Sequence, residues 1–167
     1  MNNPSYQSFS SVLVRALLAG SVYEHKYEGG TATAIRLTIQ PRKCTLQDNG
    51  RGIGLHREGY VSGLVEQLAV RRNEVALHGL GLALIAMSSP SMTIQSRRGG
   101  HKYLQRFEWA VAQGGVEVEP WDGPAGTEIS LTLADSAPEI DFDEVMVQAD
   151  LWRSAHPELH IEVVRGD

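Results

Sequence analysis

Hydrophobic positions divide the first fifty residues into a helix and a hairpin. From Phe9 to Gly20, small and apolar residues recur at three- and four-residue spacing, which predicts an amphipathic helix over residues 9–23 that Ser8 or Ser10 can cap. Strict alternation over residues 33–39 then predicts a strand. A turn at Pro41 leads into a second short strand, residues 44–47, which ends at Asp48. The hairpin therefore places a carboxylate at the end of a strand.

The rest of the chain reads as two helices, a run of strands and a final helix. Helices are predicted over residues 61–69 and 80–88, strands over 92–96, 103–110, 116–119 and 127–133, a helix over 142–152 and a strand over 161–164. Asp141 or Asp143 can cap the last helix. Helices first and antiparallel strands afterwards predict an α+β fold, a two-layer sandwich with helices packed on one face of a mixed, mostly antiparallel sheet.

Length and composition fit one soluble domain over residues 1–167. The chain is 42% hydrophobic and 21% charged, which is ordinary for a globular protein. Its one cysteine, Cys44, excludes an internal disulfide and a multi-cysteine zinc site. No apolar run approaches the length of a membrane span, and the first residues lack the features of a signal peptide. We therefore expect a cytoplasmic protein with no membrane partner.

Charge argues against a nucleic-acid surface. The formal net charge is −5, whereas phosphate backbones require clustered Lys and Arg. The adjacent arginine pairs are Arg71-Arg72 and Arg97-Arg98. Solvated positions at a helix end or a hairpin tip are the simplest interpretation of both pairs, and both remain candidates for the phosphate of a ligand.

Two glycine-containing loops carry the candidate chemistry. Residues 48–54 read Asp-Asn-Gly-Arg-Gly-Ile-Gly directly after a strand, and residues 77–82 read Leu-His-Gly-Leu-Gly-Leu at the start of an apolar helix. Glycines let the backbone lie against a flat base, and a helix start offers bare N–H groups to phosphate. Either loop alone is a weak signal, because glycine loops also end strands in proteins that bind nothing. Together they indicate a nucleotide site.

The order of elements and several motifs resemble the N-terminal ATP-binding domain of DNA gyrase B and of topoisomerase IV. That domain belongs to the wider Bergerat-fold group of histidine kinases, mismatch-repair ATPases and a heat-shock chaperone. The segments that carry the resemblance are residues 46–53, 77–81, 103–108, 126–127 and 141–159. They are spread over most of the chain, in family order.

The resemblance implies an adenine pocket for ATP or ADP. Asp48 would accept the adenine amino hydrogen, with Thr127 assisting through its hydroxyl and a shared water, and Gly50 and Gly52 would leave room for the base. The residues that the resemblance assigns to the nucleotide are Asp48, Gly50, Arg51, Gly52, Ile53, His78, Gly79, Leu80, Gly81, Arg98 and Thr127. Arg51 and Arg98 match paired arginines at the pocket edge, and residues 78–81 match the phosphate loop.

Three of these residues also have a purely structural interpretation. Asp48 can cap its loop through an Asx turn, His78 can be a partly buried histidine with its hydrogen bonds satisfied, and Thr127 can be a residue at a strand edge. The nucleotide hypothesis therefore depends on the set of motifs rather than on one of them.

The first helix departs from the family. ATP-hydrolysing members resemble one another in carrying a glutamate that polarises water and, four residues later, an asparagine that holds magnesium. Here those positions are Ala16 and Gly20, which offer no side-chain oxygen. This departure from the family implies that the first helix carries no catalytic residue and no metal ligand at these two positions, which argues against a magnesium site. Glu24 and Glu28 are the downstream acids that would have to replace the missing ones.

Two further parts of the family machinery are reduced or absent. The segment before the His-Gly motif, residues 70–76, is short and charged where the family has a long glycine-rich lid. The chain also ends where the family continues into a transducer domain that supplies a lysine. A poorly enclosed triphosphate loses much of the electrostatic stabilisation of phosphoryl transfer.

Three functions are compatible with the sequence. The leading hypothesis is an adenine-nucleotide-binding module that does not hydrolyse ATP. The second is an ATPase that uses other acids, such as Glu24 or Glu28. The third is a scaffold or regulatory protein that has lost nucleotide binding and acts through a protein partner, whose identity the sequence does not reveal.

Overall fold

The computed structural model describes residues 8–26, 29–53 and 85–167. Several sequence predictions lie outside the described residues: the helix over 61–69, the shortened lid over 70–76, the phosphate loop with His78, Gly79, Leu80 and Gly81, and the acid Glu28. The predicted helix over 80–88 is described only at its end, where residues 85–87 are helical.

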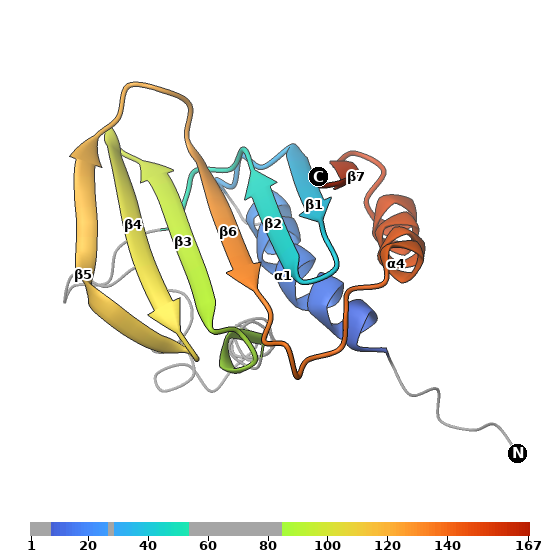
Figure 1. Cartoon of the computed structure of the whole chain (residues 1–167). Helices are drawn as coiled ribbons and strands as arrows, with labels where there is room; N and C mark the ends of the chain where they lie inside the picture. The colour runs from blue at the N-terminus through green and yellow to red at the C-terminus, as the bar shows by residue number, and fades with distance from the viewer. Residues whose placement is uncertain (1–7, 27–28, 54–84) are drawn as a thin grey trace, which may run out of the picture.

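Two helices and seven strands make up the described fold (Figure 1). In chain order they are α1 (Phe9–Lys26), β1 (Ala34–Ile39), β2 (Lys43–Asp48), β3 (Ser91–Arg98), β4 (His101–Glu108), β5 (Val111–Pro120), β6 (Gly126–Thr132), α4 (Phe142–Ala155) and β7 (His160–Arg165). The strands form one sheet in the order β5-β4-β3-β6-β2-β1-β7. Every pairing is antiparallel except that of β1 with β7, so the predicted mixed, mostly antiparallel sheet is confirmed.

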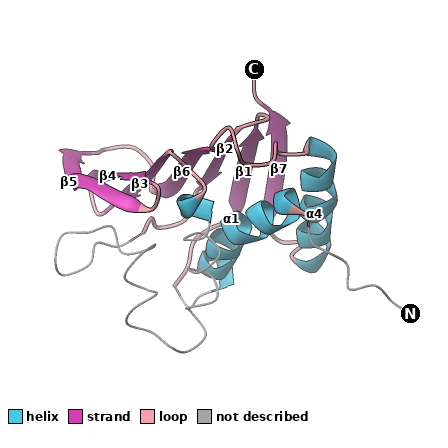
Figure 2. Cartoon of the chain, turned by 60° about the horizontal axis from the view of Figure 1, so that its bottom comes forward, coloured by secondary structure: helices cyan, strands magenta, loops and turns pink. Residues whose placement is uncertain are grey.

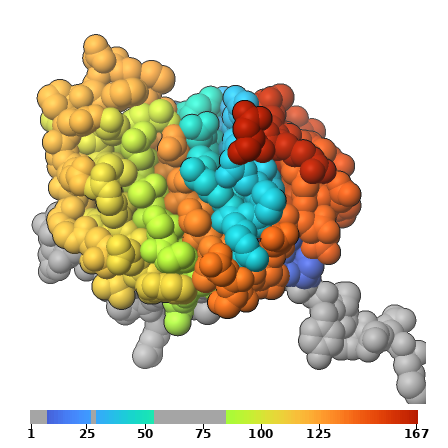
Figure 3. All heavy atoms as spheres, in the orientation of Figure 1, coloured from blue at the N-terminus to red at the C-terminus, as the bar shows by residue number. Residues whose placement is uncertain are grey.

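The helices lie on one side of the sheet, as the sequence predicts (Figure 2). α1 runs across this covered face, and α4 lies beside α1 near β7. Alternate residues of β1 point into the layer between sheet and helix, where Ile35, Leu37 and Ile39 join Leu13 and Leu17 of α1 in the buried core. The opposite face, turned toward the viewer in Figures 1 and 3, has no described helix over it, and we call it the open face.

Local caps set the start of both helices. Ser8 caps α1, because its Oγ accepts from the Ser11 N–H at 3.1 Å, whereas Ser10 is buried and accepts from the Asp141 N–H at 2.9 Å. Asp141 is the cap of α4, accepting from the Asp143 N–H at 2.9 Å and the Glu144 N–H at 3.2 Å. Of the two cap candidates at each helix, Ser8 and Asp141 are therefore the ones in use.

Several element boundaries differ from the sequence prediction, and three of them have a clear physical reason. α1 continues to Lys26 instead of ending at residue 23, because the side chains of its last turn have partners outside the helix. β4 ends at Glu108 because the next two residues, Trp109 and Ala110, have positive φ angles of 50° and 66° and turn the chain. β5 then starts at Val111, five positions before the predicted Val116. The spacing of apolar residues in the sequence contains no information on such tertiary contacts or on turns of this kind.

Candidate functional site

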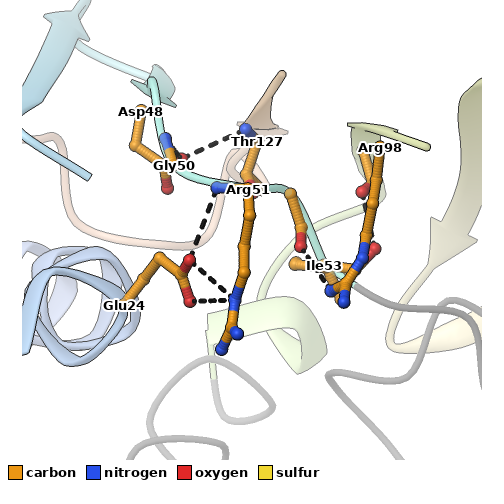
Figure 4. A network of polar contacts seen from close by, with 9 residues as sticks. Glu24, Asp48, Gly50, Arg51, Ile53, Arg98 and Thr127 are labelled. Atoms are coloured by element: carbon orange, nitrogen blue, oxygen red, sulfur yellow. Dashed lines mark hydrogen bonds and ion pairs between the residues drawn. The ribbon is translucent and has the colours of Figure 1, made fainter. Parts of the chain in front are cut away.

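Asp48 ends β2 with its carboxylate held from three directions. Its Oδ1 accepts from the N–H of Gly50 at 3.0 Å and from the N–H of Thr127 at 3.2 Å (Figure 4). Its Oδ2 accepts from the Ser21 hydroxyl of α1 at 2.7 Å, and the residue is only 9% exposed. A carboxylate offers about four acceptor positions. Three are therefore used within the protein, and one on Oδ2 remains for a ligand donor.

Burial governs the electrostatics of this carboxylate. Loss of solvation raises the pKa of Asp48 above its ordinary value of 3.8, and the nearby negative charge of Glu24 raises it further. The hydrogen bonds from Ser21, Gly50 and Thr127 act in the opposite direction, because they stabilise the charged form. The net direction is upward, so the protein holds this acid at an energetic cost that a ligand donor would reduce.

Thr127 reaches Asp48 through its backbone. The two residues are directly opposite each other in the β2–β6 ladder, and the N–H of Thr127 is the donor to Oδ1. Thr127 is itself buried. The role that the resemblance implies for its hydroxyl, through a shared water, stays a prediction. The structure shows a second contribution of Thr127, because its backbone N–H orients the Asp48 carboxylate.

Arg51 is paired with Glu24. The Arg51 Nε lies 2.9 Å from Glu24 Oε1 and 3.1 Å from Oε2, and the Arg51 N–H also points at Oε1 at 3.4 Å (Figure 4). The pair joins the last turn of α1 to the loop after β2. Glu24 is thus engaged in holding this loop, three residues after the Ser21 that holds Asp48.

Two glycines of the loop are tightly surrounded by protein atoms. A Cβ at Gly50 would lie 2.8 Å from Cγ of Glu24, and one at Gly52, where φ is +80°, would lie 2.6 Å from the Arg97 carbonyl oxygen. At Gly52 the backbone contact and the positive φ exclude larger residues, whereas a side chain at Gly50 would have to displace that of Glu24. Room for an adenine ring, which the resemblance also implies, is a further role that stays a prediction.

β3 fixes the far end of the loop. Arg98 Nη1 donates to the Gly52 carbonyl at 3.1 Å, and the Ser96 hydroxyl donates to the Ile53 carbonyl at 2.6 Å. The predicted site residues Gly52, Ile53 and Arg98 are therefore adjacent in space (Figure 4). Ser96 and Ser21 make contacts in this site, although the sequence interpretation assigned neither of them a role. Ser21 had a signal, since it immediately follows Gly20 in the helix that the family uses for catalysis.

The two positions that the resemblance aligns with the family's glutamate and asparagine, Ala16 and Gly20, lie on α1. Ala16 packs partly buried against the core, and Gly20 is exposed, with no described atom within 4 Å of the place where its Cβ would be. Across the described part of the chain, no three His, Cys, Asp or Glu side chains are grouped to hold a metal ion. The same residues include no helix long and apolar enough to cross a membrane.

The sheet order, the helix across one face and the acid at the end of β2 define the class of this fold, which is that of the Bergerat-type ATP-binding domains. The topoisomerase IV ATP-binding domain of Francisella tularensis, solved in complex with a small-molecule inhibitor, superposes with a TM-score of 0.71 and 20% sequence identity. The match covers 92% of this chain and 45% of that one. The resemblance predicted from the motifs is therefore confirmed for the fold.

Sequence comparison points to the same group. The chaperone protein HtpG of Shewanella oneidensis is 24% identical over 161 residues, which is 79% of this chain and 25% of the chaperone. HtpG of Shewanella sp. strain ANA-3 is 23% identical over the same share. The chain thus spans about a quarter of the length of these relatives. No protein-family profile matches it.

Proposed function

We propose that this chain is an adenine-nucleotide-binding module that does not hydrolyse ATP. The observation that carries the proposal is the Asp48 carboxylate, which is buried, positioned by three hydrogen bonds and left with one acceptor position. An adenine amino group is a donor of matching size and polarity. ATP or ADP is the ligand class that both the fold and this geometry support.

The α1 residues support the absence of hydrolysis. Ala16 and Gly20 bring neither a general base nor an oxygen ligand to the place where the family has both. Glu24, the described acid that would have to replace the base, is held by Arg51 at 2.9 Å. Both of its carboxylate oxygens contact Arg51, so they hold the loop after β2 and are poorly placed to activate water. Neither Ala16 nor Gly20 can bind magnesium through its side chain, so no step is assigned to this ion.

The remaining parts of the site belong to the proposal as well. Arg51 and Arg98 would border the base, and His78, Gly79, Leu80 and Gly81 would contact phosphate. A cytoplasmic location, a single-domain organisation and an additional protein partner are further parts of the proposal that follow from the sequence interpretation.

The decisive experiment is calorimetric titration of ADP and ATP into wild type and Asp48→Asn. Asparagine can still accept from the N–H groups of Gly50 and Thr127, but its amide N–H₂ would face the donor of adenine. We expect at least about tenfold weaker binding in Asp48→Asn, because a buried donor left unpaired costs about 1–3 kcal/mol. Circular dichroism should show the same fold for both proteins.

A control variant separates adenine recognition from general effects of charge. Glu139→Gln removes a carboxylate that pairs at 3.6 Å with Arg42, on residues that do not contribute to the Asp48 site. Its nucleotide affinity should equal that of wild type. Equal affinities for wild type and Asp48→Asn, or no binding by either, would reject the adenine pocket and favour the scaffold function.

A further inference from the structure

Arg97 is a partly buried cation without an ionic partner among the described residues. Its Nε is buried and makes no hydrogen bond, and within the described residues its guanidinium forms no ion pair. Its described contact is the ring of Trp121, whose centroid lies 5.9 Å from Arg97 Cζ. Guanidinium N–H groups are strong donors that proteins rarely leave unsatisfied when buried. This side chain therefore has unused donor capacity.

Arg97 and Arg98 point to opposite faces of the sheet. Arg98 reaches the loop after β2 through the Gly52 carbonyl, whereas Arg97 pairs across the sheet with Gly126 and belongs to the open face. The open face carries alternate polar residues, including Gln47 paired with Glu128 and Thr45 paired with Ser130. Arg97 is thus separated by the thickness of the sheet from the Asp48 carboxylate, which faces Ser21 of α1.

A cavity of about 260 Å³ opens next to this arginine. Its lining includes Arg97, Arg36, Gln47, Asp48, Asn49, His160 and Glu162. The sheet register explains the hollow: β7 brings His160 opposite Ala34, and β3 brings Arg97 opposite Gly126. A methyl group and a bare glycine therefore lie between two long side chains at this end of the sheet.

Gly126 also directs the arginine into the hollow. A Cβ at this residue would overlap the Asp48 carbonyl oxygen and would lie 3.0 Å from Arg97 Nη2. The guanidinium therefore extends over Gly126 toward β2, the strand that forms one wall of the cavity. The position of the Arg97 guanidinium therefore depends on the lack of a side chain at residue 126, which only glycine provides.

The other charged residues of the lining have partners within the protein, and the Asp48 carboxylate is turned to the covered face, where Ser21 donates to it. Arg36 Nε lies 3.4 Å from Glu162 Oε2, and Lys102, the neighbour of Arg97 on β4, is paired with Glu119. What remains is one guanidinium with a planar fork of donors facing a small polar hollow. This geometry matches a group with two or three oxygen atoms and a negative charge.

We propose that this open-face cavity is a second ligand site, which binds a small oxyanion, a phosphate or a carboxylate group, through Arg97. Asp48 lines this cavity as well, but its carboxylate faces Ser21 of α1, so the proposed anion contacts are separate from those proposed for adenine. Its ligand would be a free small anion or an anionic group on a larger molecule that reaches the sheet from the open side.

The test is an NMR titration of the full chain with sodium phosphate, with sodium acetate, and with sodium chloride at matched ionic strength. We expect the Arg97 Nε–H signal and the amides of Asn49 and Gly126 to shift saturably with phosphate or with acetate, and not with chloride. Saturation with phosphate alone identifies a phosphoryl ligand, and with acetate alone a carboxylate. No saturation with either anion would overturn the proposal.

Variants of Arg97 test whether this residue is the one that binds the anion. Arg97→Gln should weaken binding at least tenfold, and Arg97→Lys, which keeps the charge but loses the fork, should weaken it less. The matched control is Arg106→Gln, which removes an arginine paired with Glu117 on the same face and should bind as wild type does. Equal weakening by Arg106→Gln and Arg97→Lys, or shifts confined to residues 77–81, would overturn the assignment. If Arg97→Gln does not fold, Arg97→Lys and the wild-type titration decide.

Discussion

Glu24 and Arg51 join the last turn of α1 to the glycine loop, with 2.9 Å between Glu24 Oε1 and Arg51 Nε. We predict that Glu24→Gln lowers the free energy of unfolding by less than about 1 kcal/mol, since partly exposed pairs contribute little. Magnesium-dependent phosphate release should be at background before and after the change, as measured with exhaustively purified protein. Release that is present in wild type and lost in Glu24→Gln would show that this acid is a catalytic base.

The raised pKa of Asp48 predicts a pH-dependent stability. Because the folded-state pKa lies above the ordinary 3.8, this group stabilises the fold most below that pH, and the contribution is lost as pH rises through the folded pKa. Wild type should therefore lose stability relative to Asp48→Asn over this interval. Urea unfolding of both proteins at a series of pH values measures the difference. A difference that is constant with pH would contradict the raised pKa.

Nucleotide binding should follow the opposite trend with pH. The proposed contact requires an acceptor, and only the deprotonated carboxylate keeps Oδ2 free of a proton. We predict that ADP affinity rises as pH increases through the folded pKa of Asp48, measured by calorimetry. The affinity of the weaker Asp48→Asn protein should stay flat over the same range, after correction for protonation of the nucleotide itself. Parallel pH profiles would exclude Asp48 as the titrating group.

Gly20 is a glycine in the interior of α1 with no described atom near its Cβ position. Gly20→Ala should raise the free energy of unfolding by about 0.5–1 kcal/mol, because alanine loses less backbone entropy in a helix. Gly20→Asn should give a smaller gain, in line with its lower helix propensity. Urea unfolding tests both. Lower stability of Gly20→Ala would mean that a side chain at this position meets a part of the chain beyond the described residues.

Gly126 should tolerate no side chain. A Cβ there would overlap the Asp48 carbonyl oxygen, and the φ of +152° is unfavourable for other residues. We predict that Gly126→Ala costs about 2–4 kcal/mol of unfolding free energy, within the range of strained backbone substitutions. Gly115→Ala is the control, because no described atom lies within 4 Å of its Cβ position and its φ is ordinary. Equal stabilities of the two variants would contradict this account.

Much of the fold can be predicted from single-chain patterns. Alternation of apolar residues predicts β1, β2 and β6, and helical spacing predicts α1 and α4, because each of these elements buries one regular face. The ends of elements are less predictable. The turn at Trp109 and Ala110 uses positive φ angles on residues that carry no turn signal, so periodicity places the start of β5 five residues too late.

The site is predictable only in part, for a physical reason. Asp48 is visible in the sequence because glycines follow it. The contacts of Ser21 with Asp48 and of Glu24 with Arg51 are not, because both span 27 positions and depend on how α1 crosses the sheet. Arg97 and Arg98 are adjacent in sequence, yet the strand period of two sends them to different faces. Only the pairing of β3 with β6 shows which of them faces the open cavity.

The hydrogen bond from Thr127 to Asp48 also bears on the order in which the chain folds during synthesis. The two residues are 79 positions apart in the chain. During synthesis, Asp48 therefore leaves the ribosome long before β6, whose Thr127 donates the last of its hydrogen bonds, has been made. Until β6 arrives, β2 has only the hairpin with β1 to hold it, and an isolated hairpin is marginal in water. A nucleotide bound at Asp48, as proposed, would therefore not assist the early steps of folding. It would stabilise only chains whose synthesis has passed residue 127 and whose sheet has closed around the acid.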